Sequence, residues 1–179
     1  MSNPTRGRIT LRTAGAADAK RLYALIQANL EEGHLLPRTL GELTIHVERF
    51  VVAVKARKVV GCAELAPLSP HVAEVRSLAV DSAARGSRVG VTIVDELRRR
   101  ARREGYEKLC AFTHAPGYFI HMGFSIVPHL WLTEKVFIDC LKCPQFRQCG
   151  QYAMVVPLDV AFDAERGYGH PAASAAPLS

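Results

Sequence analysis

Long hydrophobic runs are missing from this chain of 179 residues. No stretch approaches the roughly 20 consecutive apolar residues that a transmembrane helix needs, and no N-terminal apolar segment leads to a small-residue cleavage site. We therefore expect a cytoplasmic protein with no membrane partner. The five cysteines are an odd number, which without a secretion signal argues against a disulfide framework.

Two familiar phosphate-binding motifs are also absent. A Walker A loop needs Gly-x4-Gly-Lys-Ser/Thr, and this string does not occur. A Rossmann loop needs three spaced glycines, and the candidate loop at 85–90 has only Gly86 and Gly90. With 49% hydrophobic and 22% charged residues, the chain suits a compact folded domain. The formal net charge of +6 fits either an anionic small ligand or a nucleic acid.

The segment 73–105 carries the strongest functional signal. It is typical of a buried strand with one acid, a loop of small and basic residues, and an amphipathic helix. The helix repeats apolar residues every four positions, which predicts a core-facing side, at Val89, Ile93, Leu97 and Ala101. Because backbone amides at a helix N-terminus lack partners, the loop predicts a phosphate or pyrophosphate site.

The rest of the chain alternates between strand and helix patterns. Strands are expected at 8–12, 50–54, 58–65, 72–80, 108–112 and 152–158. Helices are expected at 16–30, 40–47, 89–105 and 117–122. Thr39 is the expected N-cap of the second helix, Gly33 and Gly123 are expected to end the first and last helices, and Lys55-Ala56-Arg57 is the expected hairpin turn.

The loop from Arg85 to Gly90 resembles the acetyl-CoA loop of the GNAT superfamily of acetyltransferases. That pattern is Gln/Arg-x-x-Gly-x-Gly/Ala, and Arg88 stands where the central glycine is usual. The element order β-α-α-β-β-β-α-β-α-β-β resembles the same α/β (α+β) fold over 8–158, with a mixed, mostly antiparallel sheet flanked by helices. We expect one such domain over 1–160 and a disordered Ala- and Pro-rich tail over 161–179.

Several strings are similar to the acetyltransferase domain of N-acetylglutamate synthases: EVRSLAV, LLPRT and YFIHMGF. The C-terminal WLTEKVFIDCLKCPQFRQCGQYAM is similar to their short members, which lack an amino-acid-kinase domain. The resemblance implies direct transfer of acetyl from acetyl-CoA to the α-amine of L-glutamate, the first step of arginine biosynthesis. Arginine as an effector and a homodimer are further expectations.

The resemblance also implies roles for the strand 72–80 and the loop after it. The family's proposed general base falls on Glu74; the alternative is an ion pair with Arg76, two residues on and therefore on the same face. A strand bulge is implied to turn backbone amides toward the thioester and pantetheine, at Ser77, Leu78, Ala79 and Val80. The pyrophosphate site is implied at Arg85, Gly86, Ser87, Arg88, Val89 and Gly90.

A general acid for the leaving thiolate is less clearly indicated. Many GNAT enzymes use a Tyr four residues before a Gly-Phe pair, where this chain has Phe119, with Tyr118 beside it. A shift of one residue turns a side chain by about 100° around a helix. Tyr118 is therefore the candidate acid, with a packed aromatic and protonation by solvent as the alternatives.

The two carboxylates of glutamate call for cations with fork geometry. Arg38 in LLPRT matches a family arginine that contacts the substrate, and a solvated loop cation is its alternative. Arg76 is the second candidate because it shares a strand with Glu74.

Cys140, Cys143 and Cys149 form a C-x2-C-x5-C pattern. Zinc would need a fourth ligand such as His129, and no second cysteine pair follows, so reduced, partly buried thiols are favoured over a metal. Cys62 and Cys110 are expected in the core.

Two other functions stay open at the level of sequence. In the first, the chemistry is the same but the acceptor is glutamine, another amino acid or a protein N-terminus. In the second, the chain is a non-catalytic module that binds acetyl-CoA, or that binds nucleic acid through the basic helix face between Arg98 and Arg103. Nucleic acid is the less favoured partner of the two.

Overall fold

The computed structural model describes residues 8–31 and 35–158. Within them one seven-stranded sheet has the order β1-β2-β3-β4-β5-β7-β6. The strands are β1 (Thr10–Thr13), β2 (Phe50–Lys55), β3 (Lys58–Pro67), β4 (Val72–Val80), β5 (Lys108–Thr113), β6 (Ser125–Val127) and β7 (Tyr152–Pro157). Only the β4–β5 pair is parallel, which confirms the expected mixed, mostly antiparallel sheet.

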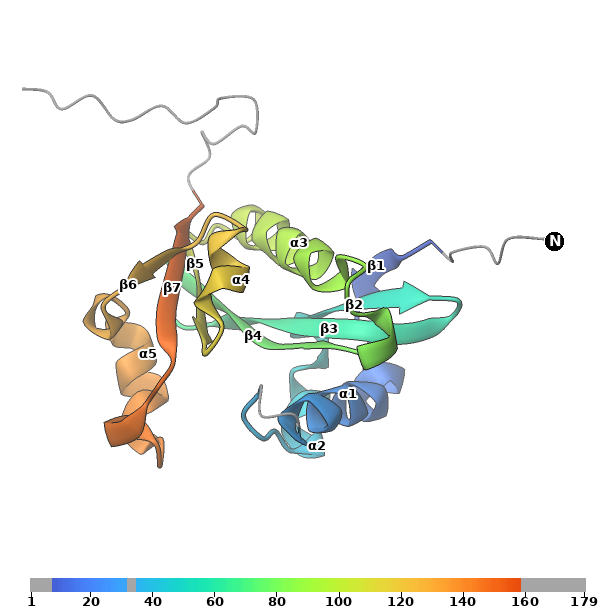
Figure 1. Ribbon diagram of the computed structural model, residues 1–179, viewed down its shortest axis with the longest axis horizontal. Helices are drawn as coiled ribbons and strands as arrows, with labels where there is room; N and C mark the ends of the chain where they lie inside the picture. The colour runs from blue at the N-terminus through green and yellow to red at the C-terminus, as the bar shows by residue number, and fades with distance from the viewer. Residues whose placement is uncertain (1–7, 32–34, 159–179) are drawn as a thin grey trace, which may run out of the picture.

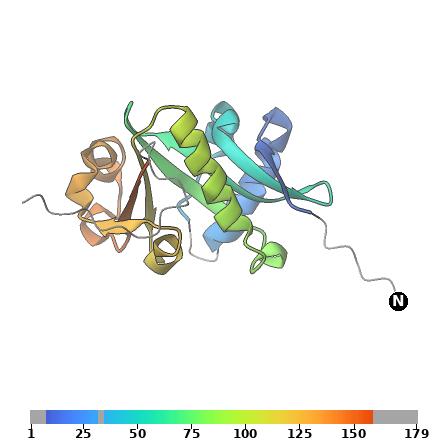
Figure 2. The same ribbon diagram turned by 90° about the horizontal axis from the view of Figure 1, so that it is seen from above.

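Helices flank both faces of this sheet. They are α1 (Ala19–Glu31), α2 (Leu40–Ile45), α3 (Val89–Arg103), α4 (Pro116–Ile120) and α5 (Thr133–Ile138). In Figure 1, α3 and α4 lie on one side of the sheet and α1, α2 and α5 on the other. Figure 2 shows α3 lying across its face of the sheet. No helix of the described segments is long and apolar enough to cross a membrane.

Most expected elements are present at their expected positions. Thr39 caps α2: its Oγ1 accepts from the Glu42 amide at 3.2 Å, and Glu42 Oε2 accepts from the Thr39 amide at 2.8 Å. The hairpin turn is shorter than expected, because Lys55 belongs to β2 and only Ala56 and Arg57, both with positive φ, connect the strands. Gly123 follows α4 with φ +84°.

Helix α5 was not expected, because its six residues are too few to show a helical apolar repeat. Gly33 and the tail 161–179 lie outside the described residues.

The two halves of the sheet part in the middle of β4. This strand pairs with β5 only from Val72 to Glu74, opposite Lys108 to Cys110, although both strands continue. Figure 1 shows β5 and β7 running in a different direction from β3 and β4. Glu74 therefore sits where the sheet opens.

A bulge follows on the other edge of β4. Glu64 pairs with Arg76 and Cys62 with Ala79, so Ser77 and Leu78 face Ala63 alone. Ser77 has φ +55°, the left-handed conformation that a bulge of this kind can require. The bulge expected near 77–80 is thus present, and it takes backbone groups out of the regular β3–β4 ladder.

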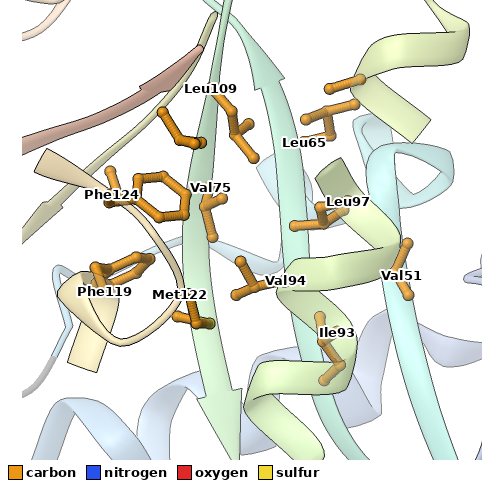
Figure 3. Close-up of a cluster of buried hydrophobic side chains, with 14 of the residues drawn as sticks. Val51, Leu65, Val75, Ile93, Val94, Leu97, Leu109, Phe119, Met122 and Phe124 are labelled. Carbon is orange, nitrogen blue, oxygen red and sulfur yellow. The ribbon is translucent and has the colours of Figure 1, made fainter. Parts of the chain in front are cut away.

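The main core lies between the sheet and α3 with α4. The expected apolar face of α3 is buried at all four positions, Val89, Ile93, Leu97 and Ala101. Figure 3 shows these helices meeting strand residues such as Val51, Leu65, Val75 and Leu109. Burying this face contributes roughly 1.5–3 kcal/mol for each large apolar side chain and fixes where the N-terminus of α3 lies.

Gly61 on β3 lies close against the first turns of α3. A Cβ there would lie 2.9 Å from Val89 Cγ1, 3.0 Å from Ile93 Cδ1 and 3.3 Å from the Ala79 carbonyl. We expect Gly61→Ala to lower the free energy of unfolding by about 1–3 kcal/mol because α3 must shift outward. Urea unfolding measures this.

Gly117→Ala is the matched control, since a Cβ at Gly117 meets nothing within 4 Å. Equal urea midpoints for the two variants would contradict the close packing of α3 on β3.

Candidate active site

A cavity of about 750 Å³ lies over the opening in the sheet. Its floor is formed by β3 and β4, one wall by the segment 35–49 with α2, and the other wall by 129–151 with α5. Glu64, Glu74, Arg76 and Ser77 line the floor, and Arg38 and Lys135 line the two walls. The structure therefore brings both arginine candidates and the candidate base into one site.

Glu74 is the centre of an ion-pair network. The carboxylate is 5% exposed and accepts from Arg76 Nη2 at 2.6 Å and from Lys135 Nζ at 2.8 and 2.9 Å. Asp139 Oδ2 accepts from the same two groups, at 2.6 and 2.8 Å. The ion pair with Arg76 that the sequence offered is thus present, and α5 adds two partners to it.

The network favours the charged form of the Arg76 guanidinium. Although burial disfavours its charge, Glu74 and Asp139 raise the pKa of the Arg76 guanidinium above its ordinary value. Lys135 Nζ also lies 5.2 Å from the centre of the Phe112 ring, where a cation is favoured. An acceptor amine entering the cavity therefore meets two carboxylates that are held in place from two sides.

Arg38 is held by a second acid. Its Nη1 donates to Glu64 Oε2 at 2.9 Å and to Ser77 Oγ at 3.1 Å. The Arg38 side chain is 12% exposed, so it is not the solvated loop cation of the alternative interpretation. Arg49 Nη1 approaches the other Glu64 oxygen at 3.9 Å.

The loop before α3 has the geometry of an anion site. Gly86 has φ +74°, and Arg88, the N-cap of α3, has φ +61° although it replaces the usual glycine. The first helical bond joins the Thr92 amide to the Arg88 carbonyl, so first-turn amides precede it without a helical acceptor. The 15-residue helix adds its dipole to these amides and to the basic loop.

The loop is anchored from below by α1. Arg85 Nε donates to the Val80 carbonyl at 3.3 Å and its Nη2 to Asn29 Oδ1 at 3.2 Å. Asn29 is buried and donates in turn to the carbonyls of Leu25 and Val80. Ser87 Oγ donates to the Ala84 carbonyl at 2.5 Å. These bonds hold the loop beside the end of the bulged strand.

Tyr118 extends from α4 toward this loop. A Cβ added at Gly90 would lie 2.3 Å from its hydroxyl, so the phenol lies against the first turn of α3. Burial, with a smaller contribution from Asp95, raises the pKa of Tyr118, which keeps the phenol protonated near neutral pH. Phe119, in contrast, is buried edge-to-face against Phe124. A proton donor at Tyr118 remains a prediction.

The three C-terminal cysteines line the cavity on the α5 side. Burial raises the pKa of the Cys140 thiol, and all three thiols are free. Within 8–31 and 35–158, no three or more His, Cys, Asp or Glu side chains are arranged to hold a metal ion, so the zinc alternative gains no support. Cys62 and Cys110 are buried, as expected, and burial raises the pKa of Cys62 to about 12.

The basic face of α3 is engaged within the molecule. Arg99 and Arg103 pair with Glu96, and Arg100 pairs with Glu104. Arg98 donates to the Met122 carbonyl and lies over the Phe124 ring. These contacts reduce the charge that a nucleic-acid surface would present.

Sequence reasoning missed four residues of the site: Glu64, Arg49, Lys135 and Asp139. Glu64 carried the same signal as Glu74, an acid inside an apolar strand. Lys135 and Asp139 stand four residues apart, a helical spacing, but the helix that carries them was not expected.

A bulged strand at a split in a mixed sheet, followed by a basic loop and the N-terminus of a long helix, defines the acetyltransferase class of fold. The model of the Acetyltransferase (GNAT) family matches residues 19–124, more than half of the chain. The chain belongs to this family of N-acetyltransferases, which use acetyl-CoA as the acetyl donor.

Curated relatives are named as acetyltransferases as well. An uncharacterized N-acetyltransferase of Chlorobaculum tepidum is 30% identical over 148 residues, 83% of this chain and 96% of that protein. An amino-acid acetyltransferase of Mycobacterium tuberculosis is 31% identical over 142 residues, 78% and 81% of the two chains. The chain spans only 26% of the amino-acid acetyltransferase of Vibrio vulnificus, to which it is 29% identical.

Solved structures share the fold. A Mycobacterium tuberculosis protein in complex with CoA and NLQ superposes with a TM-score of 0.71 at 24% identity, covering 83% of this chain and 98% of that one. The N-acetylglutamate synthase of Neisseria gonorrhoeae, complexed with coenzyme A and N-acetyl-glutamate, gives 0.74 at 22% identity, with 85% of this chain but 35% of that chain covered.

Asp139→Asn tests the electrostatic link between α5 and the sheet. Burial opposes the charge of Asp139, but Lys135 and Arg76 outweigh it and lower the pKa of the carboxyl below its ordinary 3.8. Its stabilising contribution is therefore present above that value and lost as the pH falls through the lower pKa of the folded protein.

Because this carboxylate is 36% exposed, we expect Asp139→Asn to lower the free energy of unfolding near neutral pH by less than about 1 kcal/mol. Urea unfolding at neutral pH and below about pH 3 measures it. The difference should vanish in acid, and a difference that persists there would argue against the charge as its cause.

Proposed function

We propose that this enzyme transfers acetyl from acetyl-CoA to the α-amine of L-glutamate, the first step of arginine biosynthesis, in the cytoplasm. The observation that carries the proposal is the position of Glu74, where β4 parts from β5, within a cavity lined by cations. Arg38, Arg76 and Lys135 would provide N–H donors to an amino-acid carboxylate while each also pairs with an acid of the cavity. The names of the amino-acid acetyltransferase relatives support the substrate class.

We assign the two substrates to the two sides of the bulge. The cavity between α2 and α5 receives the amino acid, and the loop Arg85–Gly90 with the first turn of α3 receives the pyrophosphate of acetyl-CoA. Backbone amides of Ser77–Val80, of which Ser77 and Leu78 lie outside the regular β3–β4 pairing, would contact pantetheine and polarise the thioester carbonyl. The fit rests on charge and on the interrupted ladder.

In this mechanism Glu74 takes one proton from the substrate ammonium, directly or through a water. The freed amine forms the new N–C bond, and the C–S bond breaks as the nitrogen loses its second proton. That second proton goes to the CoA thiolate through Tyr118 or through water, and the proton on Glu74 leaves to solvent. Lys135 and Arg76 both contact the Glu74 carboxylate, so their positions would adjust each time that this carboxylate gains or loses its proton. Both protons given up by the substrate ammonium are thus accounted for.

The first experiment measures release of CoA thiol from acetyl-CoA with each of the twenty amino acids, with and without added arginine. Glutamate should be among the efficient acceptors. Inhibition by arginine would add an effector site within this domain. No release with any amino acid would contradict the proposal and favour a peptide acceptor or a non-catalytic binder.

Glu74→Gln tests the base. The substitution keeps the shape of the side chain and removes its charge, so we expect kcat to fall about 10²–10⁴-fold while acetyl-CoA affinity changes less than about twofold. Steady-state kinetics and calorimetric titration with acetyl-CoA measure the two quantities.

The matched control is Glu107→Gln, a glutamate 63% exposed that contacts His71 and does not line the cavity. A kcat of Glu74→Gln equal to that of Glu107→Gln would remove Glu74 from the chemistry and leave it as a structural ion pair.

A further inference from the structure

We propose that Glu64 sets the discrimination between glutamate and glutamine, by neutralising the guanidinium groups that face the acceptor. The inference rests on the proposed function and deepens it, because it predicts that the enzyme accepts both amino acids. Glu64 acts through Arg38 and Arg49 and is therefore a positioning residue.

Glu64 is the most deeply buried acid of the site. Its side chain is 1% exposed on β3, directly opposite Arg76 of β4. One carboxylate oxygen accepts from Arg38 at 2.9 Å, and the other lies 3.9 Å from Arg49 Nη1. Its charge also helps to raise the pKa of Arg76. Three arginines thus share one fixed, buried negative charge.

The remaining charges of the cavity are balanced as well. Its cationic lining residues are Arg38, Arg49, Arg76 and Lys135. Its acidic lining residues are Glu42, Glu64, Glu74 and Asp139. Formal charge therefore cancels before any acceptor enters. Each of the four acids already accepts from a donor of this chain.

Glutamate and glutamine differ only in a side-chain carboxylate against an amide of similar size. Both bring the same α-amine and α-carboxylate, so the difference in their binding reports the charge that the site has left over. Binding a second substrate carboxylate is favourable where a guanidinium has no acidic partner, and it is costly where acids of the protein already pair with every cation. With Glu64 in place, the side-chain carboxylate of glutamate gains little over the amide of glutamine.

The charge of Glu64 can be removed without removing its hydrogen bond. In Glu64→Gln the amide oxygen can still accept from Arg38 Nη1, so Arg38 keeps its position and gains an unshared charge. Glu64→Asp keeps the charge and shortens the side chain. The two variants therefore separate charge from packing.

The experiment is the ratio of kcat/KM for glutamate over glutamine, with acetyl-CoA saturating. In the wild-type enzyme we expect the two kcat/KM values to differ by less than about tenfold, whichever amino acid is preferred. In Glu64→Gln we expect the ratio to rise about tenfold through a lower KM for glutamate with kcat unchanged, equivalent to one strong charged contact. Glu64→Asp should keep the wild-type ratio.

Glu107→Gln, which changes the net charge equally but lies off the cavity, should leave the ratio unchanged. A wild-type preference for glutamate of tenfold or more overturns the proposal even if Glu64→Gln does not fold. An unshifted ratio in a folded Glu64→Gln also overturns it, as does an equal rise of both KM values. If neither amino acid is acetylated, the proposed function fails together with this inference. If both are acetylated but the ratio does not shift, only the inference fails.

Discussion

The parting of β4 from β5 is the constraint on which the site depends. Once the parallel pairing ends at Glu74 and Cys110, the sheet has two separately directed halves, and polar groups lie in what would otherwise be a continuous core. The bulge at Ser77 frees backbone on the other edge of the same strand. One short stretch of β4 thus provides a carboxylate, a cation and unpaired backbone at a single place.

Burying acids at this split requires that each be paired, and the pairing shapes the cavity. Glu74 pairs with Lys135 of α5, and Arg76 pairs with Asp139 directly after that helix, while Glu64 pairs with Arg38 from the segment before α2. Removing one member of such a set leaves its buried partner unpaired, which costs more than the pair itself contributes. The walls of the acceptor cavity are therefore held to its floor by charge, whereas α3 is held by apolar packing.

Local patterns carried most of the fold. The strand 72–80 and the buried face of α3 follow from runs and repeats within a few residues, and the Thr39 cap follows from a four-residue motif. Helix α5 was not recognised because it is short, and because Phe137 within it and Leu130 and Trp131 before it are exposed apolar residues without a repeat. The loop before α3 was recognisable because the residues of its pattern are contiguous in the chain.

The family, most of the strands and helices, and the residues of the loop before α3 follow from the sequence alone, because each depends on neighbours in the chain; β6 and α5 do not. Which acids pair with which cations in the cavity is known only from the tertiary structure. Arg38 and Glu64 are 26 residues apart, and Glu74 and Lys135 are 61 apart. Such contacts depend on how the sheet splits and on where α5 settles against it, and no periodicity along the chain encodes that geometry.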